Sequence, residues 1–359
     1  RARHRHRVAL LAYGQRALEP RSERMTNDTI FDAASLTKVV ATTSSIMRLV
    51  EDGKLRLNDR VTVYLPEFQG GKSEITIRNL LTHYSGLRPD LDLEPAWQGY
   101  SLGIEKALID KPVSEPGIKF VYSDINFILL GEIVRRLGGK PLPDFARENV
   151  FTPLGMTETM FQPPAALRSR IAPTEKLKSA TTPLRGMVHD ETTRFMGGIA
   201  GHAGLFTTAE DLGRFARMLL AKGQGLFAPA TIARFTSVNS PAGQSALRGL
   251  GWDIDSPFAG NRGDLYPIGS FGHTGFTGTS LWVDPASESY VILLTNGVHP
   301  FRRPPVTPLR GRVASVAAAY VSRLEANVSG PASGPVLTRL DHLVEEKFTS
   351  LSNKSVGLI

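Results

Sequence analysis

The 359-residue chain contains no cysteine, which excludes disulfide bonds, thiolate zinc sites and cysteine nucleophiles. It has no run of about 18 apolar residues, the length that a transmembrane helix needs. A Gly-x-Ser-x-Gly sequence is also missing, which excludes the nucleophile elbow of the α/β-hydrolases. No secretory signal is visible, but the chain begins at Arg1 rather than at methionine. We therefore expect a fragment or a processed product, and the missing signal says little about location.

The composition is typical of a globular protein, with 41% hydrophobic and 21% charged residues. The length predicts one large domain or two ordinary ones. The formal net charge is +8, and part of it lies in the opening segment RARHRHR, which we interpret as a solvated arm. No basic stripe alternates with aromatic residues, so nucleic-acid binding is not expected to be the main function.

The hydrophobic periodicity and the turn residues predict a strand, then helices, then a run of strands. The first strand is expected at 8–14, and the next helix is capped by Asp32 and ends at Gly53. The other expected elements are a short helix within 75–87, a loop-rich segment at 88–118, an amphipathic helix at 126–139, an irregular segment at 150–200, a helix at 208–220 capped by Thr208, strands between 249 and 296, and a helix at 312–324. An α+β fold with a helical insertion accounts for this order.

The segment FDAASLTKVV (31–40) places Ser35 and Lys38 three residues apart at the start of the first helix. Residues at this spacing share one helix face, so the Lys38 amine can reach the Ser35 hydroxyl. Serine is a weak nucleophile until a base takes its proton, and a lysine at its ordinary pKa of about 10.4 is protonated. Ser-x-x-Lys is common by chance, but Ser35 is the only serine here that a lysine follows at this spacing.

Two later segments carry further polar groups. PGIKFVYSDINF places Tyr122-Ser123-Asp124 between a Pro-Gly turn and a helix, and FGHTGFTGTS places His273-Thr274-Gly275 on a strand flanked by glycines. Glycines on a strand allow close approach of the backbone to a ligand. A phenol, an amine and a hydroxyl form a workable proton relay if the fold brings them together.

With these three motifs in this order, the sequence closely resembles the serine β-lactamase and penicillin-binding-protein superfamily. The class C-related branch, which holds D-Ala-D-Ala carboxypeptidases and esterases, is the most similar. Three further segments resemble this branch: LLTHYSGL (80–87), GGIAGHAGLFTTAEDLGRF (197–215) and GLGWDI (249–254). The resemblance covers about residues 8–325.

The resemblance implies a β-lactamase/transpeptidase-like α+β fold, in which an antiparallel sheet is flanked by helices and a mostly helical lobe lies beside it. We expect one hydrolase domain over residues 1–325. Its α/β lobe would comprise about 1–55 and 206–325, and its helical lobe about 56–205, with a cleft between them.

The resemblance also implies a role for each motif. Ser35 would be the acylated nucleophile, and Lys38 and Tyr122 would share general-base and general-acid duty. The strand His273-Thr274-Gly275 would lie beside the substrate, and the N–H groups of Ser35 and Phe276 would form the oxyanion hole. No cofactor and no metal are expected.

Two residues depart from the family pattern. The usual asparagine of Tyr-x-Asn is Asp124, which cannot donate a hydrogen bond when ionised. Asp124 favours the charged form of Lys38, which leaves Tyr122 as the favoured base. The usual lysine of Lys-Thr-Gly is His273, and a histidine is mostly neutral near pH 7, so it holds a substrate carboxylate more weakly. Ester or peptide acyl transfer is therefore expected rather than efficient β-lactam hydrolysis.

These observations predict a serine acyl hydrolase that acts through an acyl-enzyme, either a carboxylesterase or a D-Ala-D-Ala carboxypeptidase-type enzyme. Its substrate would be a small ester or a cell-wall peptide, and its location outside the cytoplasm of a bacterium. The alternatives are a non-catalytic peptidoglycan-binding module of the same fold and a weak β-lactamase.

The end of the chain predicts a domain boundary. ANVSGPASGP (326–335) has the composition of a linker. Residues 336–359 resemble the opening of a peptidoglycan exo-N-acetylmuramidase domain, so we expect the chain to stop inside a second domain. Three remaining histidines, His83, His189 and His202, match no zinc-binding spacing. We expect them to make structural hydrogen bonds, with His202 on a loop that borders the cleft.

Overall fold

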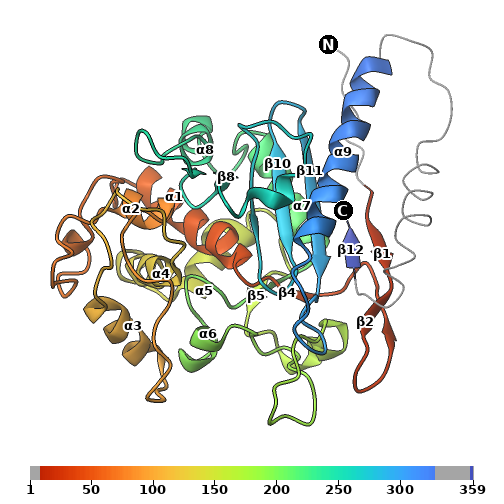
Figure 1. Ribbon diagram of the computed structural model, residues 1–359, viewed down its shortest axis with the longest axis horizontal. Helices are drawn as coiled ribbons and strands as arrows, with labels where there is room; N and C mark the ends of the chain where they lie inside the picture. Colours follow the sequence, from red (N-terminus) through yellow and green to blue (C-terminus); the bar gives the residue numbers. More distant parts are fainter. Residues whose placement is uncertain (1–8, 328–355, 359) are drawn as a thin grey trace.

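A seven-stranded antiparallel sheet occupies one side of the protein (Figure 1), in a computed structural model that describes residues 9–327 and 356–358. The strand order is β1-β12-β11-β10-β9-β8-β7. The strands are β1 (Leu11–Tyr13), β7 (Leu247–Arg248), β8 (Asp253–Asp255), β9 (Phe271–Thr274), β10 (Ser280–Asp284), β11 (Ser289–Thr295) and β12 (Val356–Leu358).

Two helices cover opposite faces of this sheet, because successive side chains of a strand point to opposite sides. Ile292 and Leu294 of β11 face the main core with α7 (Ala209–Leu220). Val291 and Leu293 face a second apolar cluster with α9 (Thr307–Asn327). The sheet is therefore buried on both sides and forms a rigid base for the residues at the ends of its strands.

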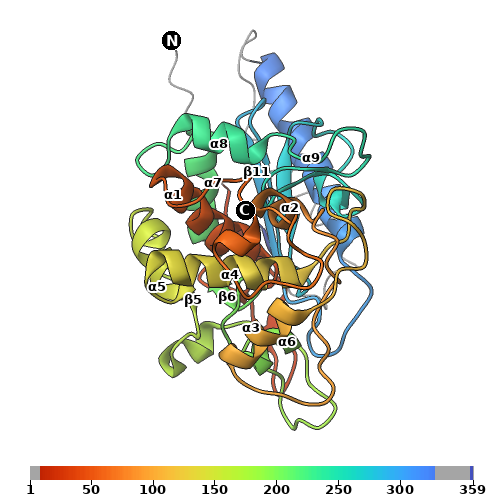
Figure 2. The same cartoon turned by 90° about the vertical axis from the view of Figure 1, so that its left-hand side faces the viewer.

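The other side of the protein is mostly helical (Figures 1 and 2). Its central element is α4 (Asp124–Gly138), which contacts four other helices, and every residue from Ile125 to Val134 is buried. A helix that is buried on all sides is a core helix rather than a surface helix. The surrounding helices are α1 (Ser44–Glu51), α2 (Ile77–Thr82), α3 (Tyr100–Ile109), α5 (Leu142–Ala146) and α6 (Glu191–Phe195), while α8 (Pro229–Thr236) packs on α1.

Two small sheets complete the fold. One pairs β2 (Gln15–Ala17) with β3 (Glu23–Arg24), and the other has the order β4-β6-β5, formed by Phe31–Asp32, Leu205–Thr207 and Met160–Phe161. The antiparallel pairing of β4 with β6 brings the segment that contains Ser35 next to the segment that contains His202. Short helical turns occupy five further segments: η1 (Lys38–Thr43), η2 (Val61–Val63), η3 (Arg147–Phe151), η4 (Ala165–Arg170) and η5 (Ala259–Arg262).

The structure corrects several expectations. The segment 88–118 is not only loop, because α3 lies within it. Its Gly103 packs closely against Met196 and Trp97, so tertiary contacts stabilise a helix that a mid-helix glycine disfavours. The helix at 126–139 is central rather than amphipathic, and the closing helix begins earlier than expected, at Thr307, and continues to Asn327.

The predicted boundaries at the end of the chain stay predictions. The linker at 326–335 falls partly in α9 and otherwise outside the described residues. Of the predicted second domain, 336–359, only 356–358 are described, and they form β12 between β1 and β11. Within the described ranges, no helix has both the length and the apolar character that crossing a bilayer requires.

The cap of α7 gives a stability prediction. The Thr208 hydroxyl oxygen accepts a hydrogen bond from the Asp211 N–H at 3.3 Å. Thr208→Ala should lower the free energy of unfolding by about 1 kcal/mol, since that N–H loses its partner. Urea denaturation measures the change, and Thr152→Ala, at an exposed threonine, should change it by less than about 0.5 kcal/mol. Equal effects of the two substitutions would contradict the capping role.

Candidate active site

Ser35 lies on a tight turn between β4 and η1. Ala34 adopts a left-handed backbone conformation with φ +48°, which costs a non-glycine residue about 1–3 kcal/mol. The Asp32 carboxylate supports this turn by accepting hydrogen bonds from the N–H groups of Ala34, at 2.9 Å, and His189, at 2.6 Å. The expected cap residue thus holds the turn that carries Ser35. The helix that follows begins at Leu36 and continues as the π-helical turn η1 from Lys38.

Lys38 is buried beside Ser35. Its Nζ donates to the Ser35 Oγ at 2.9 Å and to the His202 carbonyl at 3.2 Å, and it pairs with Asp124 Oδ1 at 2.6 Å. Burial lowers the pKa of Lys38, but the charge of Asp124, with a further contribution from Tyr122, outweighs burial and raises the pKa above its ordinary value. Lys38 is therefore an ammonium group at neutral pH and has no free lone pair to take a proton.

Tyr122 lies next to this ammonium group, with Lys38 Nζ 5.0 Å from the centre of its ring. The His83 ring stacks on the Tyr122 ring, with the two ring centres 4.4 Å apart, and so restricts the orientation of Tyr122. The His83 carbonyl accepts from the Val121 N–H, and His83 Nδ1 accepts from the Ser123 N–H, both at 3.0 Å. Burial lowers the pKa of His83 well below its ordinary value, so its ring is neutral. His83 is thus a positioning residue, as well as the structural histidine expected from the sequence.

His273 lies in β9, with its ring centre 6.1 Å from that of Tyr122. Its Nδ1–H donates to the Thr274 carbonyl at 2.8 Å. Burial lowers the pKa of His273 well below its ordinary value, and the positive charges of Arg248 and Lys38 act in the same direction. His273 is therefore neutral, and it does not supply the cation that lysine provides at this position in the family pattern.

The turn between β9 and β10 is hydrogen-bonded to the turn that carries Ser35. Thr277 and Thr279 donate from their hydroxyls to the carbonyls of Asp32 and Ala33, at 2.8 and 2.9 Å. A Cβ on Gly275 would lie only 2.6 Å from the Ala33 carbonyl oxygen, so this contact requires glycine. Phe276 follows Gly275 and is 65% exposed.

Arg310 of α9 secures the same turn from the other side. Its buried guanidinium donates through Nη2 to the carbonyls of Gly275 and Thr279, at 2.7 and 2.8 Å. Two carbonyls of one turn are thus held by one rigid donor group. Nothing in the local sequence indicates this contact, because Arg310 lies 35 residues after Gly275.

A second charged cluster lies beside Lys38. A glycine-rich loop brings His202 there, because Gly201 packs directly on the α4 backbone at Phe127. His202 Nε2 and Asp190 Oδ1 are 2.9 Å apart. Burial opposes both charges, but their mutual attraction raises the pKa of His202 and lowers that of Asp190. Asp90 lies nearby, and burial is the main cause that raises its pKa to about 6.

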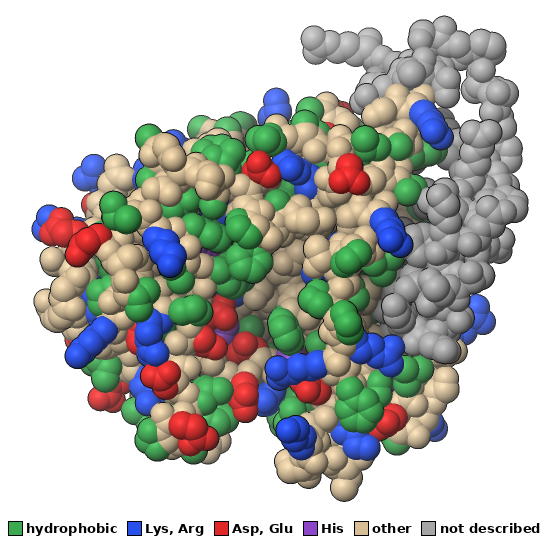
Figure 3. Space-filling model, viewed as in Figure 1, with side chains coloured by type: hydrophobic (Ala, Val, Ile, Leu, Met, Phe, Trp, Pro, Cys, Tyr) green, Lys and Arg blue, Asp and Glu red, His purple; other side chains and the backbone are tan. Residues whose placement is uncertain are grey.

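Asp124, Asp190 and His202 bring one ligand atom each within 4.8 Å of one another. The sequence spacing did not indicate this trio, which offers the geometry of a metal site. Lys38 already pairs with Asp124, and His202 with Asp190, so the carboxylates of the trio have positive partners within the protein. Figure 3 shows a hollow in this face of the protein, with acidic and histidine side chains along its lower edge.

A serine with a buried lysine and a tyrosine nearby, on this sheet and helix arrangement, is the arrangement of a serine hydrolase with a β-lactamase fold. The family model described as Beta-lactamase matches residues 2–315, and the chain belongs to this family. The predicted fold class and family are thus confirmed.

Two curated relatives share about a third of the sequence. One, from Escherichia coli strain K12, is named provisionally as a D-alanyl-D-alanine carboxypeptidase; it is 33% identical over 310 residues, covering 77% of this chain and 71% of the relative. The other, N-acetylmuramyl-L-alanine amidase of Bacillus subtilis strain 168, is 34% identical over 317 residues, covering 78% of this chain and 70% of the relative.

The solved structure of EstCE1, a hydrolase with promiscuous acyltransferase activity, is 25% identical with a TM-score of 0.63, and the match covers 81% of this chain and 86% of EstCE1. A class C β-lactamase from Rhodobacter sphaeroides, 18% identical with a TM-score of 0.65 over 86% of this chain and 90% of its own, supports the fold.

The ion pair at Lys38 gives a prediction of pH dependence. In Asp124→Asn the attraction is lost, so burial dominates and the pKa of Lys38 falls. The pH profile of kcat/KM for a nitrophenyl ester should then gain an ionisation in the neutral to alkaline range that the native protein lacks. Asp264→Asn, at an exposed carboxylate, is the matched control and should leave the profile unchanged. Identical profiles for the native protein and Asp124→Asn would contradict this account.

The contact between α9 and the β9–β10 turn gives a second prediction. Arg310→Met should lower kcat by about 10- to 100-fold, since a small displacement of a reacting group has costs of this size. KM should change less, and added guanidinium ion should restore part of the rate. The control is Arg312→Met, at an exposed arginine of the same helix. A rise in KM alone, or a loss of folded protein without rescue, would count against a positioning role.

Proposed function

We propose that this chain hydrolyses an amide bond of cell-wall peptides through an acyl-enzyme on Ser35. The observation that carries the proposal is the 2.9 Å contact between Lys38 Nζ and Ser35 Oγ beside Tyr122. Because Lys38 is held in its charged form, we assign the role of base to Tyr122. The Lys38 ammonium attracts the phenolate that this role requires and orients the Ser35 hydroxyl.

The reaction follows in balanced steps. Tyr122 takes the hydroxyl proton while Ser35 Oγ bonds to the carbonyl carbon, and the carbonyl electron pair moves to oxygen. The N–H groups of Ser35 and Phe276 receive this oxyanion. Tyr122 then returns the proton to the leaving nitrogen as the C–N bond breaks. A water molecule attacks the resulting ester by the same route and releases the acid.

The neutral His273 bears on the choice of substrate. A D-Ala-D-Ala peptide carries its terminal carboxylate one residue from the scissile amide, where a nearby cation favours binding. His273 is uncharged and its Nδ1–H is occupied by the Thr274 carbonyl. This supports an internal amide, of the N-acetylmuramyl-L-alanine kind named for the Bacillus subtilis relative. A terminal D-Ala-D-Ala bond is the less favoured substrate.

Ester hydrolysis is the second candidate. Phe258 packs 4.9 Å from the Tyr122 ring centre and is 44% exposed, and Phe276 is also exposed. These rings offer an apolar wall to the acyl group of a small ester, and EstCE1 is a hydrolase with acyltransferase activity. The same neutral His273 makes a β-lactamase activity weak, because β-lactams also carry a carboxylate.

A cell-wall substrate implies a location outside the cytoplasm, which we propose together with the activity. The alternative of a non-catalytic wall-binding module of the same fold is disfavoured, since Ser35, Lys38 and Tyr122 are all present and Lys38 lies close to both other residues.

The experiment compares N-acetylmuramyl-L-alanine amide, whose blocked C-terminus carries no carboxylate, with an N-acylated Lys-D-Ala-D-Ala peptide, with products followed by mass spectrometry. The muramyl amide should be cleaved with the higher kcat/KM. Ser35→Ala should lower that rate by roughly 1,000-fold or more and remove the covalent adduct that a fluorophosphonate forms.

The control is Ser73→Ala, at an exposed serine, which should retain activity and the adduct. Faster release of D-alanine would establish a carboxypeptidase instead. A folded native protein with neither adduct nor turnover, but which sediments with peptidoglycan, would establish the binding module.

A further inference from the structure

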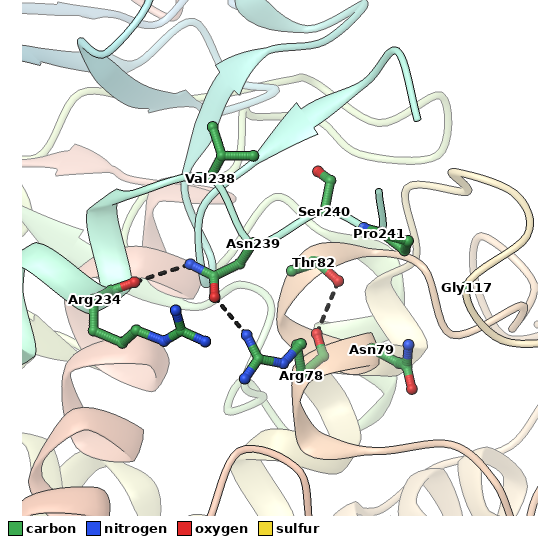
Figure 4. A pocket seen from close by; sticks show the side chains of 9 residues that line it. All are labelled: Arg78, Asn79, Thr82, Gly117, Arg234, Val238, Asn239, Ser240 and Pro241. Carbon is green, nitrogen blue, oxygen red and sulfur yellow. Dashed lines mark hydrogen bonds between the residues drawn. The ribbon is translucent and has the colours of Figure 1, made fainter. Parts of the chain in front are cut away.

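A second cavity lies apart from the candidate active site, between α2, the end of α8 and the segment after it (Figure 4). Its volume is about 450 Å³. None of its lining residues belongs to the site around Ser35. The residues that line it are Arg78, Asn79, Thr82, Gly117, Arg234, Val238, Asn239, Ser240 and Pro241.

Two arginines face this cavity without a counter-charge. Arg78 is half-buried and Arg234 is exposed, and Figure 4 shows the Arg234 side chain extending toward the Arg78 guanidinium. Within residues 9–327 and 356–358, neither guanidinium has a carboxylate at ion-pair distance. Arg185, which is also half-buried, differs, because it pairs with Glu23 at 2.6 Å. The cavity therefore has an excess of positive charge.

The partners of Arg78 are neutral and fix its orientation. Its Nη1 donates to Asn239 Oδ1 at 2.6 Å and its Nε to Asn58 Oδ1 at 3.1 Å. Asn239 is itself held, because its Nδ2 donates to the carbonyls of Arg234 and Ser237. The guanidinium is thus pre-oriented by amide oxygens, which leave its charge uncompensated. Burial and the charge of Arg234 both lower the pKa of Arg78, as expected for two unneutralised cations that face each other.

Asn79 also lines the cavity. Asn79 Oδ1 accepts from both the N–H and the hydroxyl of Thr76, which assigns the oxygen and leaves its Nδ2 as a donor at the cavity. An anion between the two arginines would replace their repulsion with two attractions, and planar guanidinium groups match the oxygens of carboxylates and phosphates. Val238 and Pro241 add an apolar wall for the group that carries the anion.

We propose that this cavity is an anion-binding site, in which Arg78 and Arg234 together hold one carboxylate or phosphate group of a ligand. Asn79 supplies a neutral donor, and Asn239 positions the Arg78 guanidinium. The site is independent of the acyl-enzyme chemistry, because no residue is shared between them.

The test is a titration of the full chain with inorganic phosphate and, separately, with acetate, at constant ionic strength set with chloride. Isothermal titration calorimetry and the midpoint of thermal unfolding report binding. We expect saturable binding of at least one of the two anions, and the stronger one identifies the ligand group as phosphate or carboxylate. Arg234→Gln should weaken that binding at least tenfold.

Arg168→Gln removes the same charge from an exposed arginine outside the cavity and should leave binding unchanged. Arg78→Gln should act like Arg234→Gln, and since Arg234 is exposed, its variant keeps the test valid if Arg78→Gln fails to fold. Ser35→Ala should bind as the native chain does, which separates this proposal from the proposed function. Binding of neither anion, or equal binding by Arg234→Gln and Arg168→Gln, would overturn the anion site.

Discussion

The buried ion pair of Lys38 with Asp124 is the interaction on which the site depends. An ammonium group without exposed surface is stable only if partners replace the water that it has lost. Lys38 has three, the carboxylate of Asp124, the carbonyl of His202 and the hydroxyl of Ser35. Each comes from a different part of the chain, so the charge of one side chain holds together the start of α4, the glycine-rich loop and the turn that carries Ser35.

The rest of the fold serves to bring these segments to one point. The pairing of β4 with β6 sets the turn of Ser35 beside the glycine-rich loop, and the central helix α4 places Asp124 at its first position. The stiff sheet carries the β9–β10 turn to Ala33, where two threonine hydroxyls hold it. The backbone strain at Ala34 persists because hydrogen bonds on both sides of the turn over-determine its conformation.

Much of this could be predicted from the sequence where the signal is local. The spacing of Ser35 and Lys38 predicted the contact between them. Asp124, in place of the usual asparagine, predicted that Lys38 is charged, and Thr208 predicted the start of α7. The contributions of His83, Arg310 and Asp190 could not be predicted, since each acts across a long separation in sequence and has no local pattern. Helix α3 was missed because contacts of Gly103 with distant residues outweigh its own low helical propensity.

The hydrogen bonds from Arg310 to the β9–β10 turn also bear on the order in which parts of the site become available during synthesis of the chain. Every residue assigned to the chemistry precedes α9, and Arg310 follows Gly275 by 35 residues. A growing chain therefore contains the proposed nucleophile, the proposed base and strand β9 before it contains the guanidinium that holds the turn. The β9–β10 turn gains this support only when α9 has been synthesised and has packed on the sheet.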